Sequence, residues 1–175
     1  MKRKWILSNI LLCIFLSACT ATILNHSAPI GIQHGTKIAV VPFANYTETP
    51  LAGERAKAIT AGVLESRGFR HLVVYQATPK DKVLFPGMTA EESQKALSIW
   101  AKKMHACYLM TGSVNEWTYK VGLDGEPVVG LSLQLIDLKT GHIIWTAVGS
   151  KSGGSRIAVS TTAQALVNDL LRGLY

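Results

Sequence analysis

The chain has 175 residues, of which 48% are hydrophobic and 17% are charged, with 18 Lys and Arg against 11 Asp and Glu. This length suits one domain with a substantial hydrophobic core. The basic residues are scattered and form no stripe with interleaved aromatic platforms, so the charge does not indicate a nucleic-acid partner.

Residues 1–18 have the layout of a secretory signal peptide of the lipoprotein type. Lys2, Arg3 and Lys4 precede an apolar stretch that ends in Leu16-Ser17-Ala18-Cys19, which looks like a bacterial lipobox. The apolar stretch is only about a dozen residues long, whereas a spanning helix needs roughly 20. We therefore expect the leader to be cleaved.

Cys19 is the predicted lipidation site. One acyl chain binds membranes only marginally, at ~0.8 kcal/mol per buried CH₂, whereas two or three chains anchor a protein stably. Thr20 follows the cysteine in place of an aspartate, which in typical Gram-negative sorting indicates the outer membrane, on its periplasmic face. The alternative is an ordinary cleaved signal with a chance cysteine. Cleavage would remove three cations and leave a mildly basic mature chain.

The remaining cysteines indicate no disulfide and no zinc cage, because Cys13 leaves with the leader. Cys107 lies in the apolar run Ala106-Cys107-Tyr108-Leu109-Met110. We expect a buried structural thiol there rather than a nucleophile.

Residues 19–35 are expected to form a lipidated tether, since residues 20–35 contain Pro29, Gly31 and Gly35 and show no helical or strand period. The folded α/β domain is expected to span residues 36–175. Residues 36–43 are β-branched and almost continuously apolar, which predicts a strand buried on both faces.

Helical spacing of apolar residues predicts a helix over residues 51–67, with Gly68 as its C-terminal stop. A second strand is predicted over residues 71–75, and a long loop over residues 76–88. Thr89 and Glu92 form a capping box for a second helix that runs to about Met104.

Three strands are predicted next, over residues 108–120, 128–138 and 142–150, with hairpin turn signals at Asp124-Gly125 and Thr140-Gly141. Ser155 is expected to cap a final helix. The order βαβαβββα predicts a single α/β domain with a mixed sheet packed with helices.

Catalytic motifs are weak or missing, so we expect no enzyme, no metal site and no cofactor. The histidines show no ligand spacing such as His-Glu-x-x-His. Residues 149–155 superficially suggest a phosphate loop but lack the Gly-Lys-Ser/Thr ending.

Two segments resemble the PelC family, the outer-membrane lipoproteins of Pel exopolysaccharide export. They are residues 42–56, which include Asn45-Tyr46 and Gly53-Glu54-Arg55, and residues 111–127, which include Tyr119-Lys120-Val121-Gly122-Leu123. The likeness covers about residues 37–172. A third segment, the strand-turn-strand pattern over residues 133–145, is similar to many envelope domains. Alone it is weak evidence for this family.

The resemblance implies a ring-shaped homo-oligomer, dodecamer-like in the family, on the periplasmic face of the outer membrane. Its implied partners are further copies of itself, an outer-membrane export pore protein, the polysaccharide, and the membrane through the lipid anchor. Family members are thought to present an acidic surface to a partly cationic polymer. The mature chain is basic, so guidance of a cationic polymer by charge requires the acids to concentrate on one surface. Glu116, Asp124 and Glu126 are the candidates. Alternatively, Asp124 only serves its turn and Glu116 is solvated.

Trp117, Tyr119 and Arg156 are candidate membrane or interface residues. Trp117 and Tyr119 share one strand face, since they lie two positions apart, and could contact sugar rings, the membrane or a neighbouring subunit. A core position is the alternative for Trp117, as it is for Trp100 and Trp145. Arg156 opens the last helical region, where it could form an ion pair at an interface.

A lipoprotein regulator of peptidoglycan synthesis on a similar fold is the alternative function. Such a protein must reach across the periplasm, whereas here about 18 residues, at most ~60 Å fully extended, separate Cys19 from Lys37. The short separation therefore favours a protein that acts close to the membrane. A periplasmic enzyme or small-ligand carrier would need a convergent polar pocket, which the sequence does not display.

Overall fold

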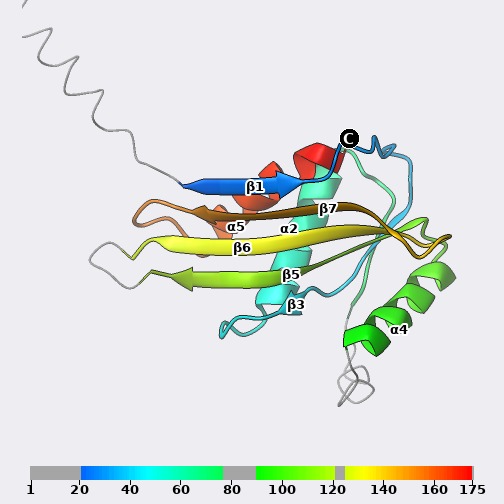
Figure 1. Cartoon of the computed structure of the whole chain (residues 1–175), viewed down its shortest axis with the longest axis horizontal. Coiled ribbons are helices and arrows are strands. Elements are labelled where there is room, and N and C mark those ends of the chain that lie inside the picture. The colour runs from blue at the N-terminus through cyan, green and yellow to red at the C-terminus, as the bar shows by residue number, and fades with distance from the viewer. Residues whose placement is uncertain (1–20, 77–89, 121–124, 175) are drawn as a thin grey trace, which may run out of the picture.

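The computed structural model describes residues 21–76, 90–120 and 125–174. Seven strands form one mixed sheet in the order β1-β7-β6-β5-β2-β4, and β3 pairs with β5 (Figure 1). The strands are β1 Thr22–His26, β2 Ile38–Val40, β3 Ala44–Asn45, β4 Leu72–Val74, β5 Tyr108–Tyr119, β6 Pro127–Asp137 and β7 Ile143–Ser152. The helices are α2 Ala52–Ser66, α4 Ala90–Lys103, α5 Val159–Leu170 and the 3-10 turn η1 Leu171–Leu174.

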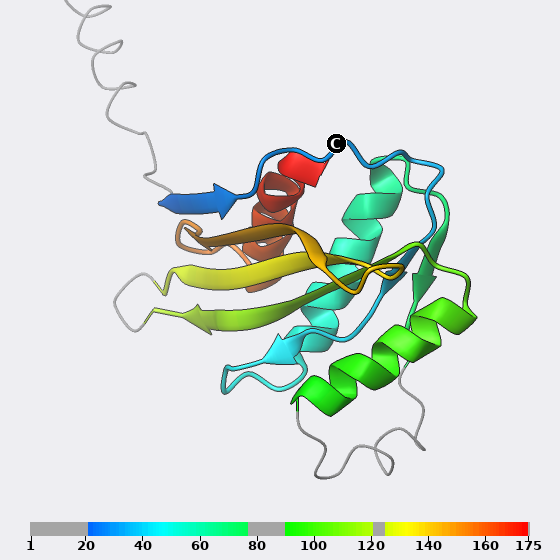
Figure 2. The same cartoon turned by 45° about the vertical axis from the view of Figure 1, so that its right-hand side comes forward.

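The helices cover the two faces of the sheet unequally. Helices α2 and α5 pack together on one face, and α4 lies apart from them, near β2 and the β6–β7 turn (Figure 2). In β2, Ile38 and Val40 join the core under α2 and α5, whereas Ala39 joins the smaller cluster under α4. This alternation confirms the prediction of a strand buried on both faces.

The large central strands carry the main core. Leu131, Leu133 and Leu135 of β6 are fully buried under α2 and α5, as expected for the apolar half of a period-two pattern. Trp145 is also in this core, 1% exposed. Strands β5, β6, β7 and β1 pair antiparallel, while β2 pairs parallel with both β4 and β5.

Strand β1 is an element that the sequence pattern does not predict, and it lies inside the segment expected to be a tether. It pairs antiparallel with β7, from Thr22 opposite Lys151 to His26 opposite Ala147. Further along the same segment, Ile32 is buried and its N–H donates to the carbonyl of Leu174 at 3.0 Å. The expectation of an unstructured stretch up to residue 35 is therefore wrong from Thr22 onward.

Two element boundaries also differ from the prediction. Helix α5 begins at Val159, and its N-cap is Ala158 without a side-chain hydrogen bond, so Ser155 does not cap it. The backbone of Arg156 is left-handed, with φ of 70°, which keeps the chain in a turn until residue 158. Strand β2 ends at Val40 before Pro42, and β3 then resumes the pairing with β5.

Cys107 is exposed, so the prediction of a buried thiol is wrong. The residue lies beyond the last turn of α4 and before β5. Its N–H donates to the carbonyl of Lys37, and its own carbonyl accepts from Leu138, at 2.9 and 3.0 Å. The apolar run thus begins two residues ahead of β5, and Cys107 lies at the end of the sheet. Among the described residues, no helix is long and apolar enough to cross a membrane.

Candidate functional site

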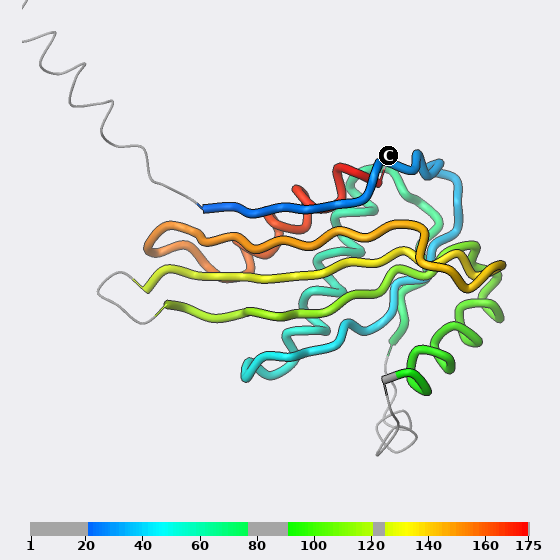
Figure 3. The backbone as a smooth tube through the Cα atoms, viewed as in Figure 1, coloured from blue at the N-terminus to red at the C-terminus, as the bar shows by residue number. Residues whose placement is uncertain are grey.

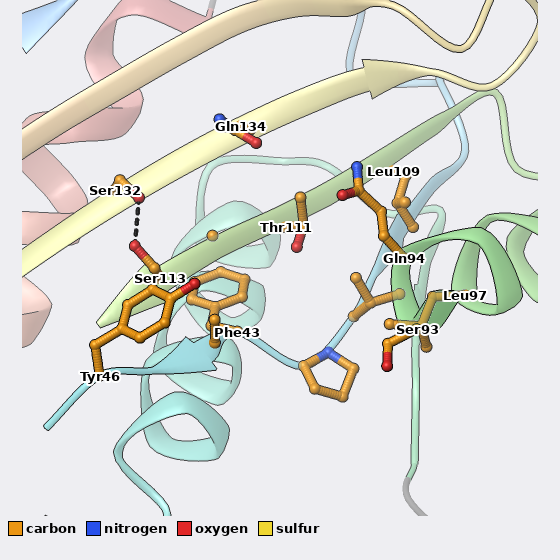
Figure 4. Close-up of a pocket in the computed structure, with 14 residues that line it drawn as sticks. Phe43, Tyr46, Ser93, Gln94, Leu97, Leu109, Thr111, Ser113, Ser132 and Gln134 are labelled. Atoms are coloured by element: carbon orange, nitrogen blue, oxygen red, sulfur yellow. Dashed lines mark hydrogen bonds between the residues drawn. The ribbon is translucent and has the colours of Figure 1, made fainter. Parts of the chain in front are cut away.

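A groove of about 480 Å³ lies on the α4 side of the sheet, beyond the part that α4 covers (Figure 4). Its walls come from the β2–β3 connection, from one side of α4, and from the adjacent strands β5 and β6. The lining residues are Val41, Pro42, Phe43, Ala44, Tyr46, Ser93, Gln94, Leu97, Leu109, Thr111, Gly112, Ser113, Ser132 and Gln134. None of them is charged.

Polar side chains from paired positions form the floor of the groove. In the β5–β6 ladder, Thr111 lies opposite Gln134 and Ser113 lies opposite Ser132. The Ser113 and Ser132 hydroxyls are 2.7 Å apart and share a hydrogen bond. These four residues continue the face that carries Leu109 and Ile136 under α4, so the sheet itself fixes their spacing.

Tyr46 stands at the rim of the groove with 70% of its surface exposed. A network of short hydrogen bonds holds the loop that carries it. The Asn45 amide nitrogen donates to the Thr49 carbonyl at 2.8 Å, and the Thr47 hydroxyl donates to the Asn45 side-chain oxygen at 2.8 Å. The Tyr46 N–H donates to the Val114 carbonyl of β5 at 2.9 Å. The loop is thus fastened both to itself and to the sheet.

Gly53 lies in the same family-like segment, residues 42–56, and close packing explains why a glycine is present there. A Cβ at this position would overlap the carbonyl oxygen of Phe43. The first turn of α2 can therefore lie directly against the chain that forms one wall of the groove. Nearby, the Lys57 ammonium is buried and bonds both Glu54 and the Tyr75 carbonyl, the latter at 2.9 Å.

A second set of charges ties α5 to its neighbours. Asp169 accepts from Lys151 at 2.9 Å and from Arg172 at 3.0 Å. Arg67 donates to the Asn168 carbonyl at 2.6 Å. Burial, and then the nearby Arg172 charge, lower the pKa of the Arg67 guanidinium, while Asp169 opposes the shift. These contacts join α2, β7 and α5, and they lie away from the groove.

Two of the three predicted polysaccharide-guiding acids, Glu116 and Glu126, lie in the described part of the chain, at different positions along the β5–β6 hairpin. Glu116 is exposed, lies opposite Gly130, and lines a shallow hollow with Asn25 and Ser150. Glu126 precedes β6, where its carbonyl accepts from the Lys120 N–H at 2.8 Å. Because Glu126 is four positions before Gly130, it lies about 13 Å along the hairpin from Glu116. Asp124 lies outside the described residues, as does the predicted lipidation site Cys19.

The predicted membrane or interface residues separate into two groups. Trp117 is 4% exposed and belongs to the main core, so the core alternative holds and Trp117 offers no external contact surface. Tyr119 is 50% exposed, and its hydroxyl accepts from the Val159 N–H at 3.2 Å. It shares the face of Trp117 but extends past the edge of the core. Arg156 is exposed in the turn before α5.

Sequence reasoning misses the groove, although part of its signal is visible. The polar half of the β6 alternation, Ser132 and Gln134, indicates by itself only the solvent side of a strand. Its partners on β5 and the side chain of Gln94 come from distant parts of the sequence, and their convergence follows from the sheet pairing and the position of α4. Within the described residues, no group of three or more His, Cys, Asp or Glu side chains could hold a metal ion.

The fold and much of the sequence are similar to solved structures of one family. The PelC dodecamer from Paraburkholderia phytofirmans is 35% identical over 87% of this chain and 96% of that chain, with a TM-score of 0.75. A single-residue variant of that protein, also a dodecamer, is 35% identical over 88% and 98%, with a TM-score of 0.74. Lipoprotein GNA1162 from Neisseria meningitidis is 22% identical over 78% and 95%, at a TM-score of 0.55, and so shares the fold. No protein-family model and no curated protein matches the chain.

Proposed function

Because the chain belongs to the PelC family, we propose that it is a periplasmic lipoprotein, anchored in the outer membrane, that assembles into a ring and assists export of a Pel-like exopolysaccharide toward an outer-membrane pore. The observation that carries this proposal is the likeness to PelC dodecamers over nearly the whole domain. When each subunit contacts the next through two different surfaces, a closed ring forms if the rotation between neighbours closes.

The position of β1 supports an anchor that holds the domain against the membrane. Thr22, where β1 begins, follows Cys19 by three positions, which spans at most about 10 Å. The chain enters β1 at the end of the molecule that also carries the β5–β6 hairpin and the β7–α5 connection (Figure 3). We infer that this end meets the outer membrane. Such a short link also disfavours the alternative of a regulator that reaches across the periplasm.

Exposed side chains at this end suit a membrane surface. Ile157 is 38% exposed and Tyr119 is 50% exposed. Tyrosine presents an apolar body and a polar tip, which matches the headgroup region. Arg156, which is exposed beside Ile157 in the chain, can pair with lipid phosphate or with an acid of a neighbouring subunit. These residues would orient the domain, while the acyl chains supply the attachment.

Charged side chains of both signs lie at both ends of the sheet: Lys120 and Arg156 accompany Glu126 at the anchored end, and Asp137 lies at the opposite end. Five cations gather at the end opposite the predicted anchor, where backbone hydrogen bonds join the starts of β2 and β5 to the β6–β7 turn. They are Lys37, Arg70, Lys102, Lys103 and Lys139. Glu116 and Glu126 lie toward the anchored end. We propose that these two acids, with Asp124, form the surface that guides a cationic polymer, repeated around the ring.

Deletion of the gene tests the export function. We expect secreted polysaccharide to disappear while polymer still accumulates inside the cell, because the proposed step follows synthesis. Full complementation by the wild-type gene is the control. Normal secretion in the deletion strain would refute the proposed function.

Metabolic labelling with a fatty acid tests the anchor. Cys19→Ala should abolish the label, since it removes the predicted acylation site, and should release the protein from the membrane fraction. Cys107→Ala provides a matched control, because this cysteine is exposed in the folded domain and should leave labelling unchanged. Unchanged labelling of Cys19→Ala would exclude lipidation at this residue.

A further inference from the structure

We propose that the groove between Tyr46, α4 and the β5–β6 floor, whose described lining residues are all uncharged, binds short neutral stretches of polysaccharide. The inference rests on the proposed function and adds to it a site for the polymer itself. It differs in kind from guidance by acids, because it involves contacts with sugar rings and hydroxyls. The groove would hold the chain briefly as it passes each subunit.

The polar groups of the groove match the chemistry of a neutral sugar. Hydroxyl and amide side chains each offer both donors and acceptors, as do the hydroxyls and acetamido groups of hexoses. Thr111, Gln94 and Gln134 make no side-chain hydrogen bond to any described residue, so their groups remain open to a ligand. In Figure 4 Gln94 extends from α4 toward Thr111. Among the described residues that line the groove, an anion finds no cationic partner and a cation finds no carboxylate.

Tyr46 supplies the apolar surface that a sugar ring needs. Its ring lies at the rim beside Ser113 (Figure 4), and it is exposed because the hydrogen-bonded loop of Asn45 and Thr47 presents it outward. Aromatic side chains bury much area at low conformational cost and carry a polar tip. The volume of about 480 Å³ lies within the range of about 300–1,000 Å³ typical of small-ligand sites.

Calorimetric titration of the full chain, purified in detergent, with a neutral N-acetylglucosamine oligosaccharide tests the groove. We expect Tyr46→Ala to weaken binding by about tenfold, through loss of the aromatic contact. Tyr46→Phe should retain binding within about twofold, since the ring remains. Gln134→Ala should weaken binding, whereas Gln164→Ala, on the exposed side of α5 in the opposite layer, should not. Light scattering and thermal unfolding on the same samples report assembly and folding.

Several outcomes would overturn the inference. Absence of wild-type binding, or equal binding by wild type and Tyr46→Ala, excludes the groove as a sugar site. A Tyr46→Ala chain with altered oligomer size and unchanged sugar binding would make the surface a contact between copies. Preferential binding of polygalacturonate would indicate an anion site elsewhere. Each of these results leaves the gene-deletion test of export untouched, so the groove and the export function can fail separately.

Discussion

Gly53 fixes the distance between α2 and the wall of the groove. Its missing side chain is what allows the helix to lie against the Phe43 carbonyl. Gly62, further along the same helix, has no heavy atom within 4 Å of the position that a Cβ would occupy. One helix thus holds two glycines, of which only the first is required by packing.

The two glycines should respond oppositely to alanine. Gly53→Ala should lower the free energy of unfolding by about 1–3 kcal/mol, because the added methyl group displaces the helix or the chain beside it. Gly62→Ala should raise it by about 0.5–1 kcal/mol, through the lower backbone entropy of the unfolded chain. Urea unfolding measures both. Equal effects of the two substitutions would show that the Phe43 contact does not control the position of α2.

At this scale the sequence can identify residue types but not their surroundings. Trp117 and Tyr119 share a strand face as predicted, yet the first is in the core and the second is half exposed. Tyr119 lies at the end of α5, where its hydroxyl accepts from the N–H of the first helical residue, Val159. The alternation of residues along a strand indicates which face of the sheet a side chain is on. It does not indicate how far a helix covers that face. The prediction for Cys107 is wrong for the same reason, since α4 ends before it.

Strand β1 is the element that most changes the interpretation of the chain. Its residues Thr-Ile-Leu-Asn-His show no clear alternation, and the strand is an edge that needs burial on only one side. Ile23 is accordingly 66% exposed, while Leu24 packs against the main core. Strong local signals, such as the apolar period of α2 and the β6 alternation, predict their elements correctly. A short edge strand depends on its partner β7 and carries little signal of its own.

Proline substitutions can test the β1–β7 ladder. The Ser27 N–H donates to Thr146 and the Ser152 N–H to the Ala21 carbonyl, so alternation directs the Asn25 N–H toward Val148 and the Thr22 N–H away from the sheet. Asn25→Pro should therefore cost at least about 1 kcal/mol of unfolding free energy through the lost bond. Thr22→Pro should cost less.

Hydrogen exchange of the β7 amides provides a second measurement, in addition to the free energy of unfolding. Asn25→Pro should speed exchange in β7, since the strand loses a paired neighbour, and Thr22→Pro should leave exchange near the wild-type rate. Unchanged exchange in both variants would mean that β1 does not protect this edge in solution.

The groove belongs to the scale of the whole molecule. It joins residues 41–46, 93–97, 109–113 and 132–134, which no local pattern connects. Sequence reasoning could predict the α/β class, the mixed sheet and the family. It could not predict that α4 covers only part of its face of the sheet, because no local pattern specifies where a helix packs on a sheet.

Assembly is the property that a single subunit cannot display. We expect light scattering of the full chain in detergent to give a mass consistent with a dodecamer, as in the PelC relatives. The mass should stay constant over a wide range of protein concentration, since a closed ring has no free ends. A mass that grows with concentration would indicate open filaments, and a monomer with or without added lipid would contradict the ring.

The antiparallel pairing of β1 with β7 also sets how the anchor would carry mechanical load. A force that draws a subunit away from the membrane would pull on β1 from its first residue, along the direction of the strand. The ladder from Thr22 to His26 would then be loaded in shear, with its hydrogen bonds strained together rather than opened one after another. A strand of five residues loaded along its length therefore resists more force than the same strand pulled perpendicular to its length, where the hydrogen bonds would open one after another.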